Sequence, residues 1–250
     1  MAALLWPLTT YAADTVETWD VGATDVDFYL GYDGLGLREA ADRAIFGDLM
    51  LGYGIVERFS VYLGTTLEAN GALADGAASP YLGIFGTVVE TDHMDFDLFL
   101  DVSTGGPNQT EFQITPSIEL NFDGRNNMST GGLYIRAGVP LHGRSGRLDE
   151  MSLDLETVIG AYYTVTAGHQ LLVEYDMGFH PIHGADHDHV VEVGGLALGY
   201  NVTLSERIEL INLVVVDIPQ SGESVSVGVM VGFIVTLPSS AGTGSMAMDR

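Results

Sequence analysis

The segment His93–Val102 reads HMDFDLFLDV, and an apolar side chain occupies every second position from Met94 to Val102. The positions between them hold His93, Asp95, Asp97, Phe99 and Asp101. Because successive side chains of a β-strand point to opposite faces, this alternation predicts a strand with one apolar and one largely acidic face. The same pattern recurs along the chain and predicts about twelve strands, near residues 25–33, 43–54, 57–69, 80–90, 94–104, 110–122, 130–140, 151–164, 169–179, 189–203, 206–217 and 223–237.

The length of these runs distinguishes two architectures. Strands of soluble proteins average about 5–6 residues, whereas a strand that crosses a membrane needs about 9–11, and most of the runs reach the second length. Their connections alternate between short links, such as 56–57 and 204–205, and long ones, such as 34–42, 141–150 and 180–188. Short periplasmic turns and longer outer loops are typical of bacterial outer-membrane barrels. We therefore predict an all-β fold, a closed antiparallel transmembrane β-barrel with both termini periplasmic.

Composition limits the partners of the protein. The 250-residue chain has 34 acidic and 9 basic residues, the basic ones all arginine, and a formal net charge of −25. Nucleic acid is not expected as a partner, because phosphate binding needs a basic surface. The chain has no cysteine, which excludes disulfides, thiolate metal sites and cysteine nucleophiles.

The two ends of the chain differ in composition from the repeated strand pattern. Residues 1–13 contain the apolar run Ala2–Trp6 and the small pair Ala12-Ala13, which predicts a truncated signal peptide for export. Residues 14–238 form the predicted barrel. Residues 239–250 are rich in serine, glycine and methionine, and we expect them to form a flexible C-terminal tail.

Three short motifs carry a resemblance to a known family. Tyr53–Val61 reads YGIVERFSV and Leu204–Leu210 reads LSERIEL; both are similar to the turn-plus-strand signature of outer-membrane transporters of the group named after the MetA pathway of phenol degradation. Ser226–Phe233 reads SVGVMVGF and resembles the last-strand assembly signal of outer-membrane barrels. The resemblance implies a transporter in the bacterial outer membrane.

If the apolar face of the strands meets lipid, the polar face lines the lumen, and Arg136 is the main inward base. Rings of carboxylates select for cations, so we expect a cation-preferring lumen in which some carboxylates are protonated or hold counter-cations. The expected partners are outer-membrane lipid and small solutes or cations. The inward carboxylates are Asp27, Asp33, Glu68, Asp95, Asp97, Asp101, Glu111, Glu119, Asp154, Glu156, Glu174 and Asp176.

One histidine-rich segment falls in a predicted outer loop. Residues 180–189 read HPIHGADHDH, and imidazole with carboxylate donors suits zinc, copper or nickel. A loosely bound divalent metal is one interpretation, and a solvated polar loop is the other. No other cofactor is expected. The candidate ligands are His180, His183, Asp186, His187 and His189.

We expect no catalytic residues. A phospholipase of the outer membrane would need a serine and a histidine together on the outer wall, and His169 is the one histidine in the lipid-facing register. Three hypotheses remain. The first is a passive channel for small solutes. The second is a plugged barrel that anchors an envelope partner, and the third is a soluble secreted β-sandwich from a salt-adapted organism.

Overall fold

The computed structural model describes residues 21–35, 44–70, 77–105, 111–123, 131–144, 147–182, 191–218 and 225–237. Within these ranges all the regular structure is strand, and no helix there is long and apolar enough to cross a membrane. The strands are β1 (Thr24–Leu35), β2 (Ala44–Val56), β3 (Phe59–Asn70), β4 (Ala77–Glu90), β5 (Asp95–Gly105), β6 (Glu111–Asp123), β7 (Gly131–Gly138), β8 (Leu141–Arg144), β9 (Arg147–Thr166), β10 (His169–Ile182), β11 (Val191–Ser205), β12 (Ile208–Asp217) and β13 (Ser226–Leu237).

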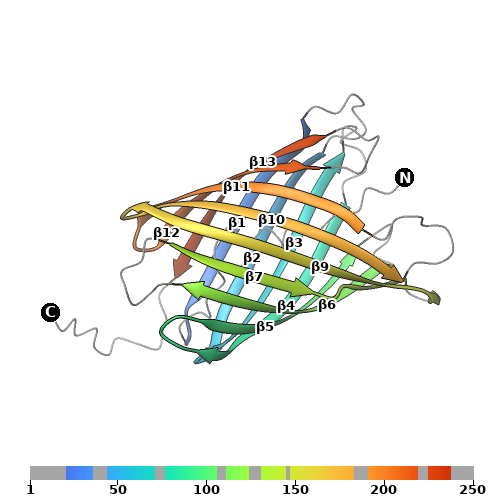
Figure 1. The fold of residues 1–250 in the computed structure, drawn as a ribbon, viewed down its shortest axis with the longest axis horizontal. Helices are drawn as coiled ribbons and strands as arrows, with labels where there is room; N and C mark the ends of the chain where they lie inside the picture. The colour runs from blue at the N-terminus through green and yellow to red at the C-terminus, as the bar shows by residue number, and fades with distance from the viewer. Residues whose placement is uncertain are drawn as a thin grey trace.

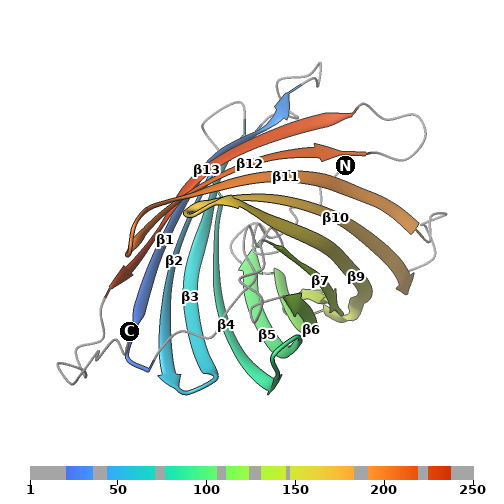
Figure 2. The same ribbon diagram turned by 60° about the vertical axis from the view of Figure 1, so that its left-hand side comes forward.

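The strands form one closed antiparallel sheet. Consecutive strands pair with each other, except that β7 and β8 both pair with β9, and β1 pairs with β13, so the ladder returns to its start (Figures 1 and 2). A closed sheet has no free edge and satisfies its own backbone hydrogen bonds, as a hydrocarbon environment requires. The predicted closed antiparallel barrel is therefore confirmed. The sandwich alternative is wrong, because a sandwich needs two separate sheets.

β7 and β8 are two parts of one barrel strand. Both pair with β6 and with β9, and the pairing with β9 keeps its register from Gly138↔Glu156 to Leu141↔Leu153. The interruption falls at Pro140, which has no N–H to donate to the ladder, although its carbonyl still accepts from Asp154 N at 2.9 Å. Counting β7 and β8 together gives the twelve barrel strands that the sequence predicts.

One predicted loop is shorter than expected. Residues 141–150 were expected to connect two strands outside the barrel, but β8 continues to Arg144 and β9 already begins at Arg147. β8 and β9 pair in register as far as His142↔Ser152, and after a register shift the last pair of the two strands is Arg144↔Arg147. The barrel wall is therefore taller at β8 and β9 than the alternation predicts.

The two ends of the barrel differ in their connections. We call the short-turn end the one that carries residues 57–58, 91–94, 167–168 and 206–207 between paired strands. Arg58 and Gly168 occupy left-handed backbone conformations there, with φ of 66° and 78°, as tight turns require. Thr24 of β1 pairs with Leu237 of β13, so the first and last strands also meet at this end. The predicted signal segment 1–13 and tail 239–250 lie outside the described residues.

The two faces of the wall differ sharply in burial. Phe28, Leu98 and Leu198 are 44–49% exposed on the outside, whereas Asp27 and Asp97 are 4% and 2% exposed on the inside. This is the outward apolar band of a membrane barrel. At these positions the apolar face of the strands is the exposed one and the acidic face is the buried one.

Candidate functional site in the barrel interior

Most of the predicted inward carboxylates are buried in the barrel interior, where they do not line open water. Asp33, Glu68, Asp101 and Glu156 are partly exposed. Glu111 is exposed and pairs with Arg144 at 3.2 Å. The seven buried members are Asp27, Asp95, Asp97, Glu119, Asp154, Glu174 and Asp176, none more than 7% exposed.

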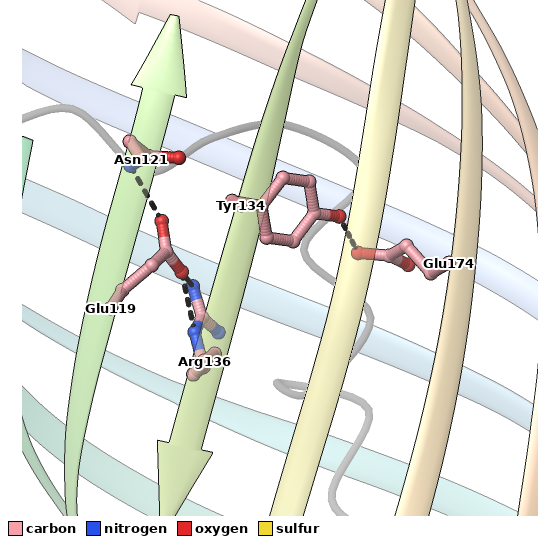
Figure 3. A network of polar contacts seen from close by, with 5 residues as sticks. All are labelled: Glu119, Asn121, Tyr134, Arg136 and Glu174. Carbon is pink, nitrogen blue, oxygen red and sulfur yellow. Dashed lines mark hydrogen bonds and ion pairs between the residues drawn. The ribbon is translucent and has the colours of Figure 1, made fainter. Parts of the chain in front are cut away.

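The predicted lumen base, Arg136, is held by an ion pair with Glu119. The two residues are direct cross-strand partners on β7 and β6. Arg136 Nε donates to Glu119 Oε2 at 2.6 Å, and Nη2 lies 2.5 Å from the same oxygen (Figure 3). Asn121 Nδ2 donates to Glu119 Oε1 at 2.8 Å. Glu119 is 0% exposed, and a charge buried to this extent is tolerated only when it is paired and hydrogen-bonded.

Tyr134 lies two residues before Arg136 on the same face of β7. Its ring lies over Gly160 of β9, where an added Cβ would come within 2.0 Å of Tyr134 Cζ. The missing side chain lets the hydroxyl reach across β9 and donate to Glu174 on β10 (Figure 3). Glycine in a strand often marks such a close approach. The two groups of contacts, Glu119 with Arg136 and Tyr134 with Glu174, together involve the four neighbouring strands β6, β7, β9 and β10.

An aromatic cluster covers the adjacent wall. Tyr62, Tyr81, Phe85 and Phe99 are all at most 9% exposed, and the rings of Phe85 and Phe99 stack with centroids 5.6 Å apart. Arg136 Cζ lies 4.8 Å from the centroid of Phe99, a distance that permits a cation–π contact. The hydroxyl of Tyr62 donates to Asp101. The cluster thus positions both Arg136 and Asp101.

Asp48 is a buried inward carboxylate that the sequence reasoning missed. The hydroxyl of Tyr81 donates to its Oδ2 at 2.7 Å, and Thr66 Oγ1 donates to its Oδ1 at 2.7 Å. The sequence contains a signal for it. Leu49 and Leu51 occupy alternate positions on β2, so Asp48 falls on the opposite face of the strand. Asp25, 7% exposed, was missed in the same way.

A polar hollow opens into the barrel interior beside Arg136. The hollow has a volume of about 50 Å³ and is open to solvent. Three of the predicted lumen residues, Asp101, Arg136 and Glu156, meet there, and hydroxyl and amide groups fill the positions between them. The lining residues are Tyr81, Asp101, Ser103, Gln113, Thr115, Ser117, Arg136, Gly138, Glu156 and Val158.

The opposite part of the interior contains buried apolar side chains. Leu172, Ile211 and Leu213 point inward from β10 and β12 and are 0–2% exposed. The sequence left the register of β12 open, since apolar residues occupy both of its faces. In the structure Asn212 faces outward, where its Nδ2 donates to the carbonyl of Tyr200 at 3.0 Å. Side chains this buried do not border a water-filled pore.

Most of the proposed metal ligands lie outside the described part of the chain. His183, Asp186, His187 and His189 lie outside the described residues, and His180 lies on β10 with its side chain outside the description. Among the described residues, no group of three or more histidine or acidic side chains is arranged to hold a metal ion. His142, expected in a loop, lies on β8 with its Nε2 3.1 Å from Asp154 Oδ2.

Comparison with known proteins identifies the fold. No family model and no curated protein matches this sequence, so membership of the MetA-pathway group remains a prediction. Among solved structures, the chain is similar to the NanC porin, with TM-score 0.66 and 10% identity over 85% of this chain and 100% of the porin.

Two further channels share this architecture. An outer-membrane channel from Pseudomonas putida F1 aligns with TM-score 0.66 and 10% identity over 88% of this chain and 97% of the channel. The KdgM porin aligns with TM-score 0.57 and 8% identity over 86% and 99%. The chain therefore has the fold of outer-membrane β-barrels.

Proposed function

We propose that the protein is a passive channel of the bacterial outer membrane that lets small solutes cross through its interior. The observation that carries the proposal is the polar hollow around Arg136. It opens from the inside of a barrel whose outer face is apolar, as expected of a wall surrounded by lipid. The likeness to three outer-membrane channels supports it. The short-turn end of the barrel then faces the periplasm, as the short turns of outer-membrane barrels do.

We further propose that the channel prefers cations. Asp101 and Glu156 both line the hollow, and Arg136, the one cation of the lining, is already paired with Glu119. An excess of fixed negative charge in a narrow passage raises the local concentration of cations and repels anions.

The test is the reversal potential of single channels in a planar bilayer under a KCl gradient. We expect a stable conductance with a cation-selective reversal potential. Asp101→Asn combined with Glu156→Gln should reduce the selectivity, because it removes both carboxylates of the hollow without changing their shape. Glu57→Gln is the matched control, since Glu57 is exposed in the turn after β2. An anion-selective conductance would refute the cation preference.

A plugged barrel that anchors an envelope partner is the second candidate. It is favoured by the buried inward side chains of Leu172, Ile211 and Leu213. Stable insertion of the folded barrel without conductance would exclude an open channel and support this candidate.

A further inference from the structure

The hollow around Arg136 is lined by charged side chains of both signs. Arg136 lies on β7 opposite Val158, so Glu156 is its diagonal neighbour on β9, at about 7–8 Å between backbones. Asp101 lies on β5, two strands away on the other side and offset by four residues along the strands, about 16 Å from Arg136 between backbones. All three side chains line the same space.

One guanidinium nitrogen of Arg136 is available to a ligand. Nε and Nη2 face Glu119, whereas the third nitrogen, Nη1, points away from that carboxylate (Figure 3). No residue of the described ranges is hydrogen-bonded to Nη1, and the side chain is 12% exposed. The ion pair therefore fixes the guanidinium in place and presents one charged donor to the hollow, where it can bind a carboxylate.

The rest of the lining selects against a simple anion. The charge of Arg136 is offset by Glu119, so Asp101 and Glu156 leave the hollow with a negative excess. A lone anion is repelled by this field, and an uncharged solute gains nothing from it. A molecule that carries both an ammonium and a carboxylate satisfies both sets of groups at once. Ser117, between Asp101 and Arg136, supplies a further hydroxyl.

From this arrangement we propose that the hollow binds small zwitterions of the amino-acid class and that these are solutes of the channel. The proposal rests on the channel function given above. Arg136 receives the carboxylate, and the ammonium lies toward Glu156 or Asp101. Binding at a partly solvated site of this kind is weak, which suits passage, because a solute held tightly would not leave.

The experiment measures fluxes of radiolabelled solutes into vesicles that contain the refolded full-length protein. The solutes are L-threonine, the uncharged erythritol of similar size, and the cation choline. We expect L-threonine to enter about threefold to fivefold faster than erythritol, the ratio that a partly solvated ion contact supplies. In Asp101→Asn/Glu156→Gln the ratio should fall to about one, whereas Glu57→Gln should keep the wild-type ratio. Heat-dependent mobility on gels verifies that each variant is folded.

The possible outcomes distinguish a failure of the zwitterion site from a failure of the proposed channel. Equal entry of L-threonine and erythritol would overturn the zwitterion site while leaving the channel intact. So would a preference that persists in the double variant, or entry of choline without L-threonine. No flux of any solute, together with no conductance, would instead refute the proposed channel.

Discussion

The buried ion pair between Glu119 and Arg136 permits a quantitative test of how the barrel interior is stabilised. Arg136→Met removes the cation and leaves Glu119, 0% exposed, with Asn121 as its remaining partner near the carboxylate. Breaking a buried pair on one side costs about 3–5 kcal/mol, because an uncompensated charge stays in a medium of low polarity. We therefore expect the free energy of unfolding to fall by about that amount.

Removing both charges should restore most of this stability. In Glu119→Gln/Arg136→Met the new amide oxygen can still accept the hydrogen bond that Asn121 donates. Replacing a buried pair by uncharged groups of similar volume is close to neutral, so we expect the double variant to lie within about 1 kcal/mol of the wild type. The second substitution should thus recover at least about 2 kcal/mol of the stability that Arg136→Met loses, which is the sign of coupling between the two residues.

The assay is urea-dependent folding into lipid vesicles, followed by far-ultraviolet circular dichroism and by heat-dependent mobility on gels. Arg58→Gln is the matched control, because Arg58 pairs with Glu90 at 3.0 Å but both side chains are more than 40% exposed. An exposed pair contributes less than about 1 kcal/mol. The reasoning fails if Arg136→Met costs no more than Arg58→Gln, or if the double variant is as unstable as the single one.

Two further predictions use the same folding assay. Gly160→Ala should lower the free energy of unfolding by about 1–3 kcal/mol, because its Cβ would lie 2.0 Å from Tyr134 Cζ. Gly47→Ala is the control and should be tolerated, since its Cβ meets only a backbone oxygen at 3.6 Å. Equal effects of the two substitutions would contradict the observed packing. Leu198→Arg should cost about 2–4 kcal/mol at the middle of the apolar band, and Leu204→Arg near the short-turn end about 0–1 kcal/mol. A cost independent of position would contradict a membrane-spanning wall.

The outward face of the barrel was predictable from local pattern. Leu98 and Leu100 alternate with Asp97 and Asp101, and the structure exposes the former to the outside and turns the latter inward. Two-residue periodicity is a property of the strand itself and needs no knowledge of its partners. Where the pattern is ambiguous, as around Asn212 on β12, only pairing with β11 and β13 sets the register.

The hollow required contacts that the sequence does not display. Glu119 and Arg136 are 17 residues apart, and Tyr134 and Glu174 are 40 apart. Their meeting depends on which residue of each strand lies opposite which, and on Gly160 leaving room for a ring. Alternation alone assigned these side chains to the inside but could not say which carboxylates are paired and which reach open space.

The amino-acid sequence was therefore sufficient for the all-β class, the number of barrel strands and the direction of most side chains, since all three follow from the period and length of apolar runs. The continuation of the wall through Pro140 and the assembly of the hollow are properties of the folded barrel. They arise from hydrogen bonding and packing between segments that are distant in the chain, and an interaction of that kind leaves no periodic trace in the sequence.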